Sequence, residues 1–195
     1  MAAFYTESDY ENALMELFGN TLGYKCECGY DTDHNVKSPL YDTVLEDRIF
    51  QINEGKPHDA IQNALLTLRN FENGTLVQKN AVFTDYLQNG ISARYTENGE
   101  ERSALIYLID WENIENNSFI CANQWTFIEN SNRRPDILLF INGLPLVLIE
   151  LKSPSRENTD ASEGYTQIRN YMHEIPSMFY YNQICVISDQ LTSKA

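Results

Sequence analysis

Two runs of apolar residues on either side of an Asn-Gly pair form the clearest pattern along the chain. Residues 137–141 and 144–149 are apolar at every position, and Asn142-Gly143 separates them. Asn-Gly favours a tight turn because both residues tolerate positive φ. Strands that are apolar on both faces are typical of the middle of a mixed α/β sheet. The pattern predicts a buried hairpin whose two open ends meet at one edge of a sheet.

Charges stand at the open ends of this hairpin, with Asp136 before the first strand and Glu150 and Lys152 at the end of the second. Glu150 and Lys152 are two residues apart and therefore share a face. Asp136 shares that face only if the hairpin contains one extra residue, because strict two-residue pairing would place Asp136 opposite Ile149. We expect a three-residue or bulged connection around residues 142–144, which makes Asp136 and Glu150 cross-strand neighbours.

Apolar residues recur at helical spacing in five other segments. The helices expected from this spacing cover residues 8–18, 41–52, 59–71, 75–88 and 163–174. The first is expected to begin with a capping box at Ser8 and Glu11 and to stop at Gly19. The last is expected to end before Pro176.

β-branched and aromatic residues predict further strands. Three such segments precede the hairpin, at residues 91–95, 103–110 and 118–128. They predict a meander that leads directly into the hairpin. Residues 183–188 predict a final buried strand, parallel to one hairpin strand through a helical crossover. We expect one α/β (α+β) domain over residues 1–195, with a helical part at about 1–90, a sheet core at about 91–195, and a mixed central sheet flanked by helices.

Two carboxylates and a lysine on one face suit the hydrolysis of a phosphodiester. Asp136 and Glu150 offer hard oxygen ligands for Mg²⁺, and Lys152 offers an ammonium beside the attacking water or the developing charge. The pattern alone is equally consistent with a salt bridge from Asp136 to Arg133 or Arg134, and with ordinary strand-end charges at the other two positions. A sugar hydrolase that uses the two acids as acid and base is a third alternative, which the adjacent lysine disfavours.

Further side chains can complete such a site. Gln167 and Tyr171 are four residues apart on one helix face, and they point to the acids if that helix packs beside the hairpin. Glu7 or Glu11 can reach the metal from the first helix, although N-terminal capping and dipole complementation are the commoner roles of such acids. The polar segment 153–162 suits a loop that moves or contacts substrate.

Composition and motifs narrow the function classes. No apolar run approaches the roughly 20 residues that span a bilayer, and no signal-peptide pattern opens the chain, so we expect a cytoplasmic protein without membrane contact. The four cysteines are scattered and are expected to be reduced thiols. Gly55-Lys56 fails the Walker pattern because Pro57 follows, so ATP is not expected to bind here. Trp111 and Trp125 fit buried sheet positions better than a base-stacking platform.

The net charge of −14 argues against a chain that grips DNA through a basic face of its own. The window 131–156 differs, because its four basic residues outnumber its two acidic residues and give a local charge of +2. Either the acidic charge lies on other faces, or another domain or subunit holds the nucleic acid.

Pro135-Asp136 and Glu150-Leu151-Lys152 match the PD-(D/E)xK nuclease motif. The surrounding segment 133–154 resembles the nuclease motif of the restriction (R) subunits of type I restriction-modification enzymes. The resemblance extends over most of the second half of the chain. Matching positions outside the segment are Asp110, Asn117, Phe119, Asn123, Gln124, Gln167, Tyr171, Pro176, Tyr181, Asn182, Ser188 and Asp189. A looser likeness covers Thr6-Glu7 and residues 47–53.

This resemblance implies a restriction-endonuclease-like fold and a type I site-specific deoxyribonuclease domain. It implies that Asp136, Glu150 and Lys152 are catalytic and that the two acids bind Mg²⁺, or Mn²⁺ in its place. Gln167 and Tyr171 would be an accessory catalytic pair.

The resemblance also implies double-stranded DNA as substrate and methyltransferase and specificity subunits as partners. The chain would then be a fragment of a larger ATP-dependent translocase subunit, with ATP bound only in motor domains beyond residue 195. The alternative is a non-catalytic docking module that keeps the nuclease fold and contacts a partner subunit.

Overall fold

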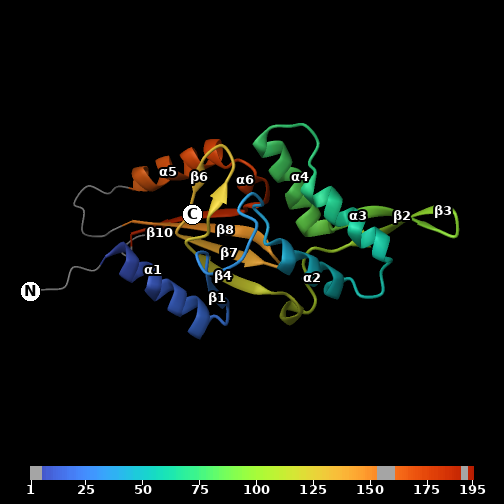
Figure 1. The fold of residues 1–195 in the computed structure, drawn as a ribbon, viewed down its shortest axis with the longest axis horizontal. Helices are drawn as coiled ribbons and strands as arrows, with labels where there is room; N and C mark the ends of the chain where they lie inside the picture. The colour runs from blue at the N-terminus through green and yellow to red at the C-terminus, as the bar shows by residue number, and fades with distance from the viewer. Residues whose placement is uncertain (1–5, 153–160, 190–192) are drawn as a thin grey trace, which may run out of the picture.

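The structure is a computed structural model and describes residues 6–152, 161–189 and 193–195. A six-stranded sheet lies at its centre, with the strand order β1-β4-β7-β8-β9-β10 (Figure 1). Its strands are β1 (Lys25–Cys28), β4 (Phe119–Asn123), β7 (Ile137–Ile141), β8 (Leu144–Leu151), β9 (Ile184–Ser188) and β10 (Ser193–Lys194). The β1–β4 and β8–β9 pairs are parallel and the other pairs are antiparallel, which confirms a mixed sheet. The strand predicted at residues 183–188 is β9, and it runs parallel to the hairpin strand β8 as predicted.

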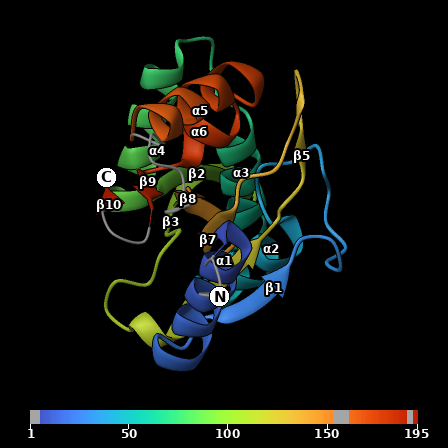
Figure 2. The ribbon, with the colours of Figure 1, turned by 90° about the vertical axis from the view of Figure 1, so that its left-hand side faces the viewer.

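Helices cover both faces of this sheet (Figures 1 and 2). The helices are α1 (Glu7–Glu16), α2 (Asp42–Ile52), α3 (His58–Arg69), α4 (Leu76–Asn89), the short 3₁₀ turn η2 (Ile114–Asn116), α5 (Ala161–Glu174) and α6 (Met178–Tyr181). Leu14 of α1 packs into a core with Ile137 on one face. Ile168 of α5 packs into a core with Leu138 on the other face. Neighbouring residues of β7 thus point to opposite covered faces, which confirms that this strand is buried on both sides.

The hairpin between β7 and β8 turns tightly. Asn142 and Gly143 have φ angles of 51° and 79°, and Ile141 pairs directly with Leu144. A Cβ on Gly143 would lie 2.7 Å from the Tyr41 carbonyl oxygen, so the start of α2 packs directly on the turn. The expected three-residue or bulged connection at the turn is therefore wrong, because Asn-Gly forms the two-residue turn that matches the twist of the strands.

The irregularity of the hairpin lies within β8 instead. Leu139 pairs with Val147, but Phe140 pairs with Pro145, which leaves Leu146 as the extra residue. Pro145 offers no N–H to the ladder, which accounts for the break in pairing next to it. The single extra residue that the alternation of faces requires is thus present, farther from the turn than predicted.

A second region lies beyond the turn, at the right of Figure 1, and contains α3, α4 and two further strands. Within the described residues, β2 (Ile91–Glu97) and β3 (Glu100–Ile106) pair only with each other. The predicted meander from these strands into the hairpin is therefore wrong. Ile91 and Ala93 of β2 are buried while Ser92 is exposed, because β2 packs one face on α3 and leaves the other to solvent.

A small hairpin of β5 (Phe127–Ile128) and β6 (Asn132–Arg133) leads into Pro135. Its tip reaches the C-terminal end of α5, where the Asn130 N–H donates to the Glu174 carbonyl oxygen at 3.0 Å. Figures 1 and 2 both show this hairpin extending from the sheet to α5. The chain that enters β7 is therefore fixed to the helix that covers the sheet.

The first helix begins earlier than predicted. Thr6, rather than Ser8, is its N-cap, and Asp9 completes the capping box. The chain then continues through a π-helical turn at Leu17–Thr21 instead of stopping at Gly19. The other four helices begin and end within two residues of their predicted bounds. In the described ranges, no helix combines the length and the apolar character needed to cross a membrane.

Candidate active site

The hairpin register brings the two predicted acids together. Ile137 pairs with Ile149, so Asp136 and Glu150 form the next opposed pair toward the open end. Ile137 and Ile149 face α1, and the two acids therefore lie on the sheet face that α5 covers. Asp136 Oδ2 accepts a hydrogen bond from the Leu151 N–H at 2.7 Å, which ties the start of β7 to the end of β8.

Lys152 is held directly beside Glu150. Its backbone N–H donates to the Ser188 carbonyl oxygen at 2.9 Å, which continues the pairing of β8 with β9. Its ammonium donates to Glu150 Oε1 at 2.8 Å, to the Leu151 carbonyl oxygen at 2.9 Å and to Gln167 Oε1 at 3.0 Å. Because a lysine ammonium has three donors, this cation is fully bonded and fixed in place.

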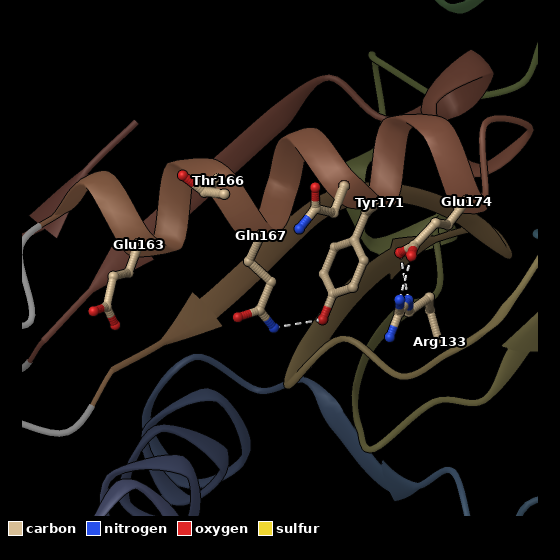
Figure 3. A pocket seen from close by; sticks show the side chains of 7 residues that line it. Arg133, Glu163, Thr166, Gln167, Tyr171 and Glu174 are labelled. Carbon is tan, nitrogen blue, oxygen red and sulfur yellow. Dashed lines mark hydrogen bonds and ion pairs between the residues drawn. The ribbon is translucent and has the colours of Figure 1, made fainter.

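Gln167 and Tyr171 project from the same face of α5, as Figure 3 shows, and Gln167 reaches the Lys152 ammonium that binds Glu150. The Gln167 side-chain amide accepts from Lys152 and donates to the Tyr171 hydroxyl oxygen at 2.8 Å. Burial and the nearby Glu150 carboxylate raise the pKa of Tyr171, so its hydroxyl stays protonated. The predicted pair thus lies beside the acids and orients the lysine.

Burial makes the two carboxylates expensive to ionise. Burial and the charge of Glu150 raise the pKa of Asp136 to about 7, and the Leu151 N–H and Lys152 oppose that rise. Burial also raises the pKa of Glu150, against the effect of Lys152. Glu150 Oε2 is buried and has no hydrogen bond of regular geometry within the described part of the chain. Such a pair favours a cation between its oxygens.

The two candidate acids of α1 have different surroundings. Glu11 is buried, and its Oε1 and Oε2 accept from the side-chain amides of Asn123 at 2.6 Å and Gln124 at 2.7 Å. Glu7 lies close enough for its charge to raise the pKa of Asp136. Across the described residues, no group of three or more His, Cys, Asp or Glu side chains forms a cluster that could hold a metal ion.

Gln124 is a supporting residue whose role the sequence pattern did not reveal. Its backbone N–H donates to the Asp136 carbonyl oxygen at 3.1 Å, while its side chain donates to Glu11. Its φ of 54° is unusual for a residue other than glycine. The only sequence signal for a role of Gln124 was that Asn123 and Gln124 are among the positions that resemble the R subunits.

A cavity of about 420 Å³ opens along α5 where Gln167 and Tyr171 project (Figure 3). It is lined by Arg133, Glu163, Thr166, Gln167, Asn170, Tyr171 and Glu174. The Arg133 Nε and Nη2 atoms donate to the two carboxylate oxygens of Glu174, and this pairing holds the pKa of Glu174 below its ordinary value. The Arg134 guanidinium lies over the Tyr30 ring, 4.8 Å from its centre. The alternative of a salt bridge from Asp136 to either arginine is therefore wrong.

The remaining candidates fall outside this site. Trp125 is buried and stacks with His34 at 3.9 Å between ring centres, so it cannot stack bases. Trp111 is 59% exposed, which contradicts a buried position for it, and its indole N–H donates to the Leu87 carbonyl oxygen. The four cysteines are free thiols, as predicted. In the predicted loop 153–162, residues 153–160 lie outside the described residues.

Comparison with known sequences establishes the family. A sequence model of the family described as "Type I restriction enzyme R protein N terminus" matches residues 4–194. The chain belongs to this family. The matched range contains Glu7, Asp136, Glu150 and Lys152 as well as α5, so the R protein family match includes every side chain of the candidate site.

Curated relatives in the R protein family are much longer than this chain. The putative type I restriction enzyme MjaIXP endonuclease subunit of Methanocaldococcus jannaschii is 33% identical over 194 residues, which cover 94% of this chain and 18% of the relative. The type I restriction enzyme HindI endonuclease subunit of Haemophilus influenzae is 35% identical over 198 residues, covering 96% of this chain and 19% of the relative. The chain therefore spans just under one fifth of the R protein relatives it matches.

Proposed function

We propose that this chain is an endonuclease domain with a restriction-endonuclease-like PD-(D/E)xK core, which hydrolyses DNA phosphodiester bonds with a divalent metal ion. The observation that carries the proposal is the buried pair Asp136 and Glu150, opposed across two strands with Glu150 Oε2 left without a regular partner among the described residues. The relatives named as endonuclease subunits support the same reaction class.

The donor set fits Mg²⁺, or Mn²⁺ in its place. Both acids offer hard carboxylate oxygens, and two like charges at a buried site are costly unless a cation shares them. The pKa of about 7 for Asp136 reflects that cost in the metal-free protein. Asp136 and Glu150 would hold the ion, which when bound polarises the phosphate and lowers the pKa of a bound water.

The chain's own side chains then have distinct roles. Lys152 provides a fixed positive charge beside Glu150, where a phosphate gains negative charge as its bond breaks. Gln167 holds the Lys152 ammonium in place, and Tyr171 fixes the orientation of the Gln167 amide. Gln167 and Tyr171 therefore act as positioning residues for the lysine.

We propose further that the domain works within a larger type I restriction enzyme, because the matched relatives carry that name and this chain covers only 18–19% of their length. Motor domains that use ATP, together with methyltransferase and specificity subunits, would hold the double-stranded DNA. This division of labour accounts for a cutting domain with a net charge of −14.

Isothermal titration of the chain with Mg²⁺ and Mn²⁺ tests the proposal. Wild type should bind one ion, and Glu150→Gln should bind it roughly tenfold more weakly or worse, because one ligand charge is lost. Glu112→Gln is the matched control, since the exposed Glu112 lies near Asp110 at the turn end of the hairpin and its loss changes the net charge equally. A docking module predicts no ion at the acid pair, and equal binding by all three proteins would reject metal-dependent cleavage here.

A further inference from the structure

Arg133 lines the cavity that Gln167 and Tyr171 also line, and a carboxylate covers its charge. Its side chain is 39% exposed and pairs with Glu174, whose side chain is 29% exposed. Ion pairs this accessible to water are weak, because water screens both charges. The planar guanidinium fork that holds a carboxylate holds a phosphate in the same two-pronged way. A phosphate can therefore replace the Glu174 carboxylate at the Arg133 guanidinium without any change in the backbone.

The backbone of Arg133 is fixed relative to the acids. Arg133 pairs with Phe127 in the β5–β6 hairpin and stands three residues before Asp136. The tip of that hairpin is bound to the end of α5, since Asn130 donates to the carbonyl oxygens of Glu174 and His173. Only the side chains of Arg133 and Glu174 need to move for the exchange.

The neighbouring basic side chains at the open end of the hairpin are already engaged by other groups. Lys152 is occupied by Glu150, and Arg134 rests over the exposed ring of Tyr30. Of the described basic side chains, Arg133 is the one that lines the cavity shared with Gln167 and Tyr171. A DNA strand that places one phosphate at the acids would carry its neighbouring phosphates past this cavity.

We propose that Arg133 binds a DNA backbone phosphate next to the scissile one, by exchanging the Glu174 carboxylate for that phosphate. This inference rests on the proposed nuclease function and adds a positioning residue for its substrate. Glu174 keeps the guanidinium covered until a phosphate competes for it.

Binding of a fluorescein-labelled DNA duplex of about two helical turns, measured by fluorescence anisotropy over a series of salt concentrations, tests this exchange. Arg133→Gln should weaken binding about fivefold and reduce the slope of log affinity against log salt by about 0.9, the value for one phosphate contact. Arg133→Lys, which keeps the charge, should restore the slope but only part of the affinity. Glu174→Gln should tighten binding about threefold, because the competing carboxylate is gone.

Two controls separate the exchange from a general effect of charge. Arg169→Gln removes an exposed arginine elsewhere on α5, and Glu112→Gln removes an exposed acid at the turn end of the hairpin. Each should change binding less than its counterpart at the cavity. Equal effects of Arg133→Gln and Arg169→Gln on affinity and salt slope would overturn the inference, as would a wild type that binds no duplex at low salt. The nuclease proposal is decided separately, by metal binding at Glu150.

Discussion

The two ends of the β7–β8 hairpin bury polar side chains for different purposes. At the turn end, Asn142 is fully buried, and its amide donates to the Leu108 carbonyl oxygen and to Asn117 Oδ1 and accepts from the Ser118 N–H. At the open end, Glu150 is 1% exposed and leaves one oxygen without a regular partner among the described residues. The turn end buries neutral amides that are fully hydrogen-bonded, and the open end buries carboxylates whose ionisation is costly.

This difference separates stability from function within one element. Neutral, fully bonded amides hold the turn at little electrostatic cost, whereas buried carboxylates of raised pKa weaken the fold until a cation binds. Substitutions at the turn end should therefore reduce stability, and substitutions at the open end should reduce activity. The following experiments test that division, beginning with the largest expected effect.

If the domain works in a type I restriction enzyme as proposed, alanine at Asp136, Glu150 or Lys152 should lower DNA cleavage by that enzyme roughly 10³-fold or more, because each removes a charge at the reacting phosphate. ATP hydrolysis by the same preparations should stay unchanged, since the motor would be intact. Cleavage and ATPase assays on one sample measure both. Cutting that persists in all three variants would contradict the proposed site.

Asn142→Ala should destabilise the chain by about 3 kcal/mol, because it leaves buried backbone groups unpaired and places alanine at a positive φ. Urea unfolding measures the loss. Asn70→Ala is the control, since Asn70 is exposed and its side-chain amide donates to the Leu66 carbonyl oxygen. Similar losses in both variants would show that the turn amide does not support the fold.

Asp136→Asn should stabilise the metal-free chain above neutral pH. The folded pKa of Asp136, about 7, exceeds the ordinary 3.8, so folding favours the protonated acid and stability falls as pH rises between these values. Removing the charge should stabilise the chain at pH 8, where Asp136 is ionised, and change its stability very little at pH 4. Melting temperatures at both pH values measure this, with the exposed Asp47→Asn as control. A destabilised variant at pH 8 would contradict the raised pKa.

Tyr171→Phe should have the smallest effect on stability, about 1 kcal/mol or less, because the ring stays packed and only the hydroxyl is lost. Cleavage should fall more than stability does, since Gln167 loses the partner that orients its amide toward Lys152. Thermal unfolding and cleavage assays compare the two effects. The exposed Tyr165→Phe on the same helix should change neither, and matching losses in both variants would refute a positioning role.

The sequence predicted the parts of this structure whose signals are local. Helix bounds followed from apolar spacing, and the proximity of Asp136 and Glu150 followed from the alternation of strand faces. The α5 pair was found because Gln167 and Tyr171 stand one helical turn apart. Each of these inferences needs only the geometry of one element or of one hairpin.

The parts that were missed depend on contacts between distant segments. The bonds from Asn123 and Gln124 to Glu11 join residues that are 112 and 113 positions apart, so no local pattern indicates them. The Arg133–Glu174 pair was missed for the same reason, because its two residues are 41 positions apart. The segment that forms β2 was predicted to join a meander with the main sheet, and only its pairing and its packing on α3 show that it belongs to a separate sheet.

Leu146 is the extra residue that places Asp136 and Glu150 on the same face of the sheet, and this limits which length changes the hairpin can accept in evolution. A chain lacking that residue could still form the Asn-Gly turn and a regular ladder, yet one carboxylate would then point to α1 and the other to α5. Single-residue deletions or insertions between the acids should thus be tolerated by the fold and eliminated by selection for cutting. Length changes in this segment should survive only in pairs that restore the phase of the two strands.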